Sequence, residues 1–209
     1  MKKGFMFVFD GSNGAGKTTV IKGVEKYLTL KGFDVLLTRE PGGTPIGEKI
    51  REVILDPSTP EMCYMTELML FGAGRAQHVQ EKIIPALAQG KIVISDRFDA
   101  ATFSFQHFAR GIDLDTIIKI NDLALAGFMP DMNIILDLDP HEGLKRVISR
   151  GEGLDRLEDE KSDFLAKARD GYLKQAEQSP ERFEIIDAAQ SKEDVLSDVI
   201  HIIDALLES

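Results

Sequence analysis

The amino-acid sequence predicts an α/β fold in which helices cover both faces of a five-stranded parallel sheet. Two observations support this prediction. Short apolar runs alternate along the chain with longer amphipathic stretches, which is typical of repeated strand–helix units. The apolar runs also lack regular apolar–polar alternation, as expected of parallel strands, because both of their faces are buried.

Five apolar runs rich in β-branched and aromatic residues are the predicted strands. In chain order they cover residues 5–10, 34–38, 92–96, 133–137 and 183–187. No internal repeat and no low-complexity segment interrupts this series. With 209 residues the chain is long enough to bury a core, and we expect a single domain over residues 1–209.

Amphipathic stretches with helical spacing fill the intervals between the strands. The predicted helices cover residues 17–30, 47–55, 61–89, 99–109, 114–125, 140–150, 161–178 and 191–207. Several of them are followed by a glycine that can end a helix, namely Gly32, Gly90, Gly111, Gly127 and Gly151. Pro85 lies inside the third stretch, and we expect it to kink that helix or to end it early.

The overall composition narrows the function classes. Hydrophobic residues make up 43 % and charged residues 29 % of the chain, which is ordinary for a globular protein and disfavours disordered and membrane classes. The formal net charge of −10 gives a surface that repels a nucleic-acid polymer, so we expect no nucleic-acid partner. A small anionic ligand would need a local cluster of Arg and Lys, which makes the arginine positions informative.

Cysteine content and hydropathy indicate the compartment. Cys63 is the single cysteine in the sequence, which excludes an internal disulfide framework and a CxxC site for zinc or redox chemistry. The first apolar run stops at Asp10, too early for a secretory signal. No apolar run reaches the roughly 18 residues of a transmembrane helix. We therefore expect a cytoplasmic protein with no membrane partner.

The strongest local signal is a Gly-rich pattern between the first predicted strand and the first predicted helix. It fits G-x-x-x-x-G-K-[ST] and consists of Gly11, Ser12, Asn13, Gly14, Ala15, Gly16, Lys17 and Thr18. The glycines allow backbone N–H groups to converge on phosphate oxygens, and the following helix adds the positive end of its dipole. We expect this phosphate loop and Thr19 to bind a nucleoside triphosphate, with Lys17 neutralising its β- and γ-phosphates.

Two residues are candidates for a Mg²⁺ site. The Thr18 hydroxyl occupies the loop position that joins the Mg²⁺ shell in proteins with this loop. Asp96 ends the third predicted strand, and adjacent parallel strands bring their carboxyl ends to the same edge of a sheet. Asp96 therefore either approaches Mg²⁺ or caps the helix that follows it, since Asp is a common N-cap residue.

Proteins with a phosphate loop include GTP-dependent switches and enzymes that move a phosphoryl group to a second substrate. The N-K-x-D and D-x-x-G motifs of the switches do not occur in this sequence. Transfer between nucleotides brings two sets of phosphates together, so such an enzyme needs several arginines in one crevice. The sequence offers six candidates, namely Arg39, Arg51, Arg75, Arg97, Arg150 and Arg156.

Arg39 and Arg97 follow predicted strands directly, at the sheet edge where ligands of open α/β folds bind. Any single one of these arginines could be a solvated surface charge. Their common edge, beside a phosphate loop in an acidic protein, indicates an anionic second substrate instead.

Several stretches resemble those of bacterial thymidylate kinases, and the likeness covers nearly the whole chain. The most specific one is REPGG within residues 38–44, and others are DRF at 96–98, residues 67–75, FSFQ at 103–106, and residues 154–158. The resemblance implies a P-loop kinase fold and transfer of a phosphoryl group from ATP to dTMP, with Mg²⁺ as cofactor. It also implies a homodimer, which we expect to form through the helices at 61–89 and 114–125.

The resemblance implies a binding pocket for the thymine base. The base would stack on Phe71 and accept a hydrogen bond from Arg75, with Thr102 and Gln106 nearby. Phe71 could instead be a core aromatic of its helix, since helical spacing favours the core.

The resemblance also places residues at the remainder of the acceptor. Arg39, Arg51 and Arg97 would hold the acceptor monophosphate. The other predicted acceptor-binding residues are Asp10, Asn13, Pro41 and Phe105.

A lid over about residues 148–160 would bring Arg150 and Arg156 to the ATP phosphates. The phosphate loop contains no arginine, which agrees with the bacterial family members, whose lid supplies the catalytic arginine. We therefore predict Lys17, Arg97 and Arg150 as the catalytic residues.

Three positions depart from the family pattern. Asn13 replaces an acid that meets the 3′-hydroxyl of the acceptor sugar, Phe105 replaces a Tyr, and Ala101 replaces a Ser. The loss of one charge and two hydroxyls weakens the expected contacts with the acceptor. A kinase for a related deoxynucleoside monophosphate and a catalytically silent nucleotide-binding protein therefore remain alternatives on sequence alone.

Overall fold

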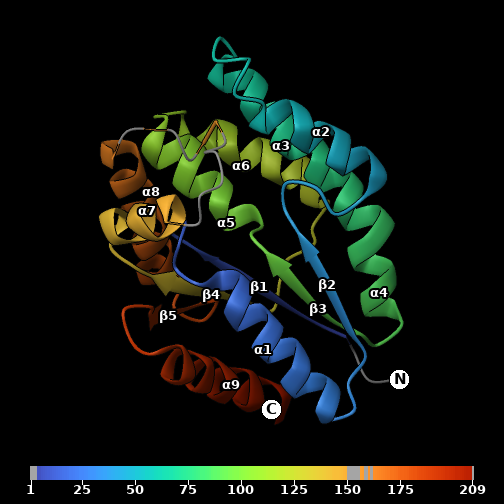
Figure 1. Ribbon diagram of the computed structural model, residues 1–209. Helices are drawn as coiled ribbons and strands as arrows, with labels where there is room; N and C mark the ends of the chain where they lie inside the picture. The colour runs from blue at the N-terminus through green and yellow to red at the C-terminus, as the bar shows by residue number, and fades with distance from the viewer. Residues whose placement is uncertain (1–3, 150–155, 158–159, 161, 209) are drawn as a thin grey trace.

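The structure, a computed structural model, describes residues 4–149, 156–157, 160 and 162–208. At its centre is a five-stranded, all-parallel sheet with the strand order β2-β3-β1-β4-β5 (Figure 1). The strands are β1 Phe5–Gly11, β2 Val35–Arg39, β3 Ile92–Asp96, β4 Met132–Asp137 and β5 Phe183–Asp187. The predicted fold class is confirmed, and Arg39 is the last residue of its strand instead of the first residue after it.

Helices surround the sheet on both faces (Figure 1). They are α1 Lys17–Leu30, α2 Pro45–Leu55, α3 Tyr64–His78, η1 Val79–Ile83, α4 Ile84–Ala88, α5 Asp99–Thr102, η2 Phe103–Ala109, α6 Leu114–Leu125, α7 Pro140–Ile148, α8 Ser162–Gln178 and α9 Lys192–Glu208. Helices η1 and η2 have π-helical hydrogen bonding. None of these helices, within the described residues, combines the length and the hydropathy that a membrane-spanning helix needs.

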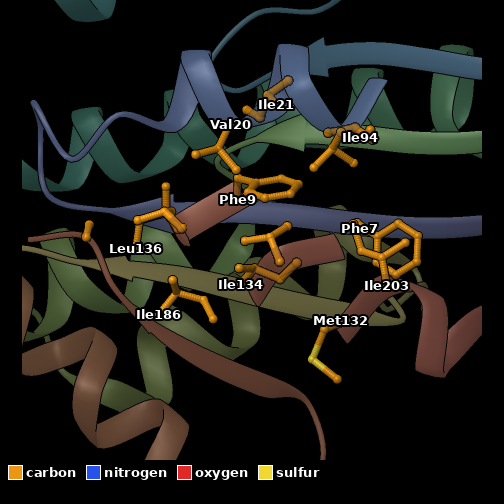
Figure 2. Close-up of a cluster of buried hydrophobic side chains, with 14 of the residues drawn as sticks. Phe7, Phe9, Val20, Ile21, Ile94, Met132, Ile134, Leu136, Ile186 and Ile203 are labelled. Atoms are coloured by element: carbon orange, nitrogen blue, oxygen red, sulfur yellow. The ribbon is translucent and has the colours of Figure 1, made fainter. Parts of the chain in front are cut away.

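β1 lies in the middle of the sheet, and its side chains fill the cores on both sides. Phe7 and Phe9 pack with residues of α1 and α9 on one face (Figure 2). Met6 and Val8 pack on the other face with residues of η1, α4 and α6. All four side chains are fully buried. This double burial explains why the strand shows no apolar–polar alternation.

Local capping sets the start of α2. The helix begins at Pro45, not at residue 47 as predicted, because Thr44 Oγ1 accepts a hydrogen bond from Gly47 N at 3.0 Å. Proline suits the first helical position, since its missing N–H would have no partner there. The third predicted helix begins at Tyr64 instead of residue 61, and its N-cap residue, Cys63, makes no side-chain capping hydrogen bond.

The predicted helix ends are confirmed at four glycines. Positive φ angles of 88°, 77°, 79° and 83° occur at Gly32, Gly90, Gly111 and Gly127, respectively. A residue with a side chain rarely adopts this conformation, so glycine ends a helix at little cost. Gly151 lies outside the described residues.

The helix that contains Pro85 does not end there. Instead, α3 passes into the π-helical η1, in which Ile84 N donates to Val79 O, and the chain stays helical to Ala88. A proline removes one backbone donor and clashes with the carbonyl four residues earlier. A π turn just before Pro85 accommodates that defect within a continuous helical segment.

Candidate active site

A cavity of about 320 Å³ opens beside the carboxyl ends of β2 and β3 and the phosphate loop. Residues from α2, α3, α5 and η2 form its other walls. Most of the predicted site residues line it, namely Asn13, Gly14, Gly16, Lys17, Thr18, Thr19, Arg39, Pro41, Arg51, Phe71, Arg75, Asp96, Arg97, Thr102, Phe105 and Gln106. The structure therefore joins the phosphate loop and the predicted acceptor residues in one cavity.

The phosphate loop is a tight turn that only glycine can form at two positions. Gly11 and Gly14 have φ angles of 122° and 78°, and an added Cβ would lie 2.2 Å from the carbonyl oxygens of Leu136 and Gly143. Close packing against β4 and α7 thus fixes the loop backbone.

Further hydrogen bonds within the loop and to its neighbours stabilise the turn. Ala15 N donates to Ser12 O at 3.3 Å, and the Ser12 hydroxyl donates to Leu138 O at 3.1 Å. Lys17 Nζ donates to the carbonyl oxygens of Gly11 and Ser12 at 3.1 and 3.0 Å. The ammonium group is therefore held directly at the loop.

The start of α1 suits an anion. The residue before the helix, Gly16, has a left-handed backbone and supplies no side-chain cap to the first-turn N–H groups. Such N–H groups and the helix dipole together favour a phosphate group. The open space around Gly16, where an added Cβ would meet no atom within 4 Å, leaves room for it.

Thr18 and Asp96 could hold a Mg²⁺ ion. Both line the cavity, and the Thr18 side chain is exposed. In the part of the chain that the structure describes, no group of three or more His, Cys, Asp or Glu forms a cage for a metal. An oxygen pair of this kind fits Mg²⁺, which takes one or two protein ligands and completes its shell with phosphates and water.

Arg97, which lines the cavity, has an unusual backbone conformation. Its φ angle is 70°, a left-handed conformation that is uncommon for residues other than glycine and that clusters at functional sites. The Arg97 guanidinium donates to Asn13 Oδ1 and to Tyr172 Oη, the latter at 3.0 Å. It also lies over the Phe105 ring, 5.3 Å from the ring centre.

Asp10 lies behind Arg97 and does not line the cavity. Its side chain is fully buried, and Oδ1 accepts hydrogen bonds from Tyr172 Oη at 2.8 Å and from Arg97 Nη1 at 3.4 Å. Asp10 Oδ2 is buried without a hydrogen-bond partner. Burial raises the pKa of Asp10 to about 6, although Arg97, Tyr172 and Lys17 act to lower it. Its contacts are those of a residue that holds Arg97, whereas the sequence predicted a substrate contact.

Arg75 lines the cavity and is buried, with 2 % of its surface exposed. Its guanidinium donates to Glu40 at 2.9 Å, to Thr102 at 3.0 Å, to Asn121 at 2.7 Å and to Phe98 O at 3.0 Å. These hydrogen bonds fix the planar guanidinium group in one orientation.

Two further arginines surround the loop that follows β2. Arg39 Nη2 donates to Glu48 Oε2 at 2.8 Å on the exposed side. The half-buried Arg51 donates from Nη1 to Pro41 O at 2.8 Å. Both side chains line the cavity, as Arg97 does, so three arginines contribute positive charge to its wall.

Arg156 is not at the phosphate loop. Its Nε donates to Ile54 O at 2.7 Å, and its Nη2 donates to the buried carboxylate of Glu67 at 2.5 Å. This ion pair explains the position, because a buried carboxylate needs a counter-charge. Arg150 lies outside the described residues. The same holds for residues 151–155 and 158–159 of the predicted lid and for residue 161, where the next predicted helix begins.

Comparison with known proteins agrees with this geometry. The family model for thymidylate kinase matches residues 9–199. The chain is 47 % identical over 196 residues to the thymidylate kinase of Geobacillus sp. strain WCH70, with 93 % of each chain covered. It is 42 % identical over 200 residues to the thymidylate kinase of Clostridium novyi strain NT, covering 95 % of this chain and 98 % of the relative. The chain belongs to the thymidylate kinase family.

Membership of the thymidylate kinase family confirms the resemblance found in the sequence. The family is one of nucleoside monophosphate kinases, so the chain is an enzyme, and a silent nucleotide-binding protein is disfavoured. Phe71 is half-buried and lines the cavity, which favours a ligand contact over a pure core position.

Sequence reasoning missed several residues of this thymidylate kinase site. Glu40 and Leu157 line the cavity, and each sits beside a predicted residue in the sequence. Arg146 Nη1 approaches Gly14 O at 3.5 Å from α7. Tyr172 contacts both Asp10 and Arg97 from α8, and no local signal in the sequence marks it.

Proposed function

We propose that this chain transfers a phosphoryl group from ATP to dTMP, giving dTDP and ADP, as a single-domain cytoplasmic enzyme that uses Mg²⁺. The observation that supports this proposal is the shared cavity, in which the phosphate loop faces Arg39, Arg51 and Arg97. A cavity that binds one nucleotide needs no second group of arginines, whereas two phosphorylated substrates placed head to head do.

The donor side binds ATP through the phosphate loop. Backbone N–H groups from Gly14 to Thr19 and the start of α1 face the phosphates, and Lys17 moves its ammonium group from the loop carbonyls to the phosphate oxygens. Thr18 and Asp96 would hold Mg²⁺, which would supply positive charge to the phosphate groups. Arg150, on a lid over residues 148–160, adds positive charge at the transferring group.

The acceptor side positions the monophosphate of dTMP. Arg39, Arg51 and Arg97 neutralise it, and an oxygen of this phosphate attacks the γ-phosphorus of ATP in line with the leaving oxygen of ADP. One P–O bond forms as the other breaks, and no covalent enzyme intermediate occurs. Arg97 lies beside the phosphate loop, so it stabilises charge on both nucleotides.

The base of the acceptor occupies the pocket formed by α3, α5 and η2. The exposed part of Phe71 offers a stacking surface for a flat base. Gln106, Thr102 and Arg75 line this pocket with polar groups, and all three residues are almost fully buried. Such a wall rejects a base whose hydrogen-bonding edge does not match it.

A coupled assay of ADP release tests the proposal. The purified chain is supplied with ATP, Mg²⁺ and one of dTMP, dUMP, dCMP, dGMP or dAMP. We expect the highest kcat/KM for dTMP. A preference for another monophosphate would replace the substrate in this proposal, and no turnover with any of the five would overturn the kinase assignment.

We also propose a homodimer formed through α3 and α6. These neighbouring helices expose apolar side chains to solvent, among them Met65 and Met69 on α3 and Leu114 and Ile118 on α6. Burying such a surface favours association. Light scattering should give twice the chain mass, and Met69→Lys should shift the protein to monomer. The matched control, Leu30→Lys, changes an even more exposed apolar residue, on α1, and should leave the mass unchanged.

A further inference from the structure

Glu67 of α3 is a fully buried carboxylate that no step of the proposed reaction uses. Four hydrogen bonds converge on it. Gln106 Nε2 donates to Oε1 at 3.0 Å, Arg110 donates from Nε and Nη2 at 3.2 Å each, and Arg156 Nη2 donates to Oε2 at 2.5 Å. The residue thus connects α3, η2 and the segment around Arg156.

The charges around Glu67 are balanced. Arg110 also pairs with Glu160 at 2.5 Å, and its guanidinium lies over the Tyr64 and Phe164 rings at 4.7 and 4.4 Å. Two guanidinium groups therefore face two carboxylates. Burial alone would raise the pKa of Glu67, but the hydrogen bonds from Arg110 and Gln106 outweigh it and lower that pKa. Glu67 is an anion that can only accept hydrogen bonds.

An anion next to Gln106 determines which way its amide points. A side-chain amide carries an NH₂ donor on one side and a carbonyl acceptor on the other. Because Glu67 only accepts, Gln106 must turn Nε2 toward it, which leaves Oε1 as the atom available to the cavity that Gln106 lines. The base pocket then presents a hydrogen-bond acceptor at this point.

We propose that Glu67 is a positioning residue that sets base specificity: it locks the Gln106 amide so that its oxygen accepts a hydrogen bond from a pyrimidine with an N–H at N3. This inference rests on the proposed function. Thymine and uracil carry that N–H, whereas cytosine has a lone pair at N3 and would face the Gln106 oxygen with two acceptors in contact. An unmatched acceptor pair in a closed pocket strongly disfavours binding.

The hydrogen bond from Arg156 to Glu67 affects the same wall of the pocket. Arg156 is held by Glu67 and by the carbonyl oxygens of Ile54 and Leu55, and the next residue, Leu157, lines the cavity. Removing the Glu67 charge therefore loosens both the amide and the apolar wall beside it. The expected effect is on acceptor binding, since none of these atoms contacts the phosphate loop.

The variant Glu67→Gln tests this proposal, because a glutamine can donate as well as accept and so lets Gln106 turn around. We expect the ratio of kcat/KM for dTMP to that for dCMP to fall at least about tenfold, through KM, with kcat for dTMP changed by less than about threefold. The matched control is Glu160→Gln, which removes the other carboxylate of the cluster and should leave the ratio unchanged.

Two further variants distinguish a positioning role of Glu67 from a purely structural one. Glu67→Asp keeps an accept-only group and should retain most of the dTMP preference. In a Gln106→Leu background, Glu67→Gln should have no further effect on the ratio. An unchanged ratio in Glu67→Gln, or an equal loss in Glu160→Gln, would overturn the proposal. Failure of the proposed function is distinct, since it would appear as no dTMP turnover in the wild-type enzyme.

Side-chain amide NMR of the wild-type enzyme adds a test that does not depend on whether Glu67→Gln folds. With dTMP bound, one amide proton of Gln106 should exchange with solvent far more slowly than those of the exposed Gln89. Exchange of the Gln106 amide at the Gln89 rate with dTMP bound would overturn the inference.

Discussion

Glu40 and Arg75 form an ion pair in which Nη2 of the guanidinium lies 2.8 Å from Oε2 of the carboxylate, with only 5 % and 1 % of the two side chains exposed. Glu40 Oε1 also accepts from His78 Nδ1 at 3.0 Å, and His78 Nε2 lies 2.6 Å from Thr38 Oγ1. This chain of polar contacts ties the loop after β2 to α3. One buried carboxylate therefore holds the loop after β2 against α3, and both segments contribute residues to the cavity.

Replacing Glu40 should destabilise the fold. In Glu40→Gln the Arg75 guanidinium stays buried without its counter-charge, and breaking a buried pair in this way costs about 3–5 kcal/mol. The free energy of unfolding in urea measures the loss, and KM for dTMP should rise with it because Arg75 lines the pocket.

The control for Glu40 is Glu48, in the first turn of the next helix, α2. Glu48 pairs with Arg39, and 41 % of its side chain is exposed. Glu48→Gln should cost less than about 1 kcal/mol, because exposed ion pairs contribute little. Equal losses in the two variants would show that burial of the Glu40 pair has no special energetic role.

Lys17→Met should abolish most of the activity and leave the fold intact. The ammonium group is held at the loop carbonyls, so its loss removes charge stabilisation at the transferring phosphate, worth about 10²–10³ in kcat. Lys22→Met, on an exposed position of the same helix, is the control and should keep full activity. A Lys17→Met enzyme of near-normal rate would refute the assignment of the phosphate loop.

The sequence was sufficient for the parts of the site that are local in the chain. The phosphate loop, Asp96 and Arg39 each lie at or beside the end of an apolar strand, and parallel strands bring such ends to one edge. The pattern of residue types near strand ends therefore predicted the cavity. The family resemblance added the base pocket on α3 and η2.

The missing parts depend on contacts between residues far apart in the chain. Tyr172 donates a hydrogen bond to Asp10, which lies 162 residues earlier in the chain. The helical periodicity of the sequence predicts only that Tyr172 is a buried residue of an amphipathic helix. The orientation of the Arg156 side chain could not be predicted from the sequence either, because its ion pair with the buried carboxylate of Glu67 determines it. Asp10 was placed correctly near the site, but its complete burial behind Arg97 follows only from packing.

Asn13→Asp should strengthen binding of the acceptor. A carboxylate accepts a hydrogen bond from the sugar 3′-hydroxyl about twice as strongly as an amide does, so KM for dTMP should fall about fivefold. Arg97 already donates to Asn13 Oδ1 and supplies a counter-charge for the new acid. The matched substrate is 3′-deoxythymidine monophosphate, which lacks the hydroxyl. A gain that persists with this substrate would exclude the sugar contact as its cause.

Asp10 makes stability depend on pH in a direction opposite to that of most carboxylates. Burial, the largest effect, raises its pKa from 3.8 to about 6. Between these pH values Asp10 keeps a proton in the native protein that it has released in the unfolded chain. The stability that Asp10 contributes is therefore fully present below pH 4 and is lost as the pH rises through 6. Each pKa unit corresponds to about 1.4 kcal/mol, which gives a loss of ~3 kcal/mol across this window.

The variant Asp10→Asn isolates this contribution, because an amide resembles the protonated acid and does not titrate. The wild-type and variant proteins should differ little in their free energy of unfolding at pH 4. As the pH rises to about 7, the variant should become more stable than the wild type. Taking the difference between the two proteins cancels the other titrating groups that both retain. A difference that stays constant from pH 4 to 7 would mean that Asp10 is ionised throughout, and that Arg97 and Tyr172 offset its burial completely.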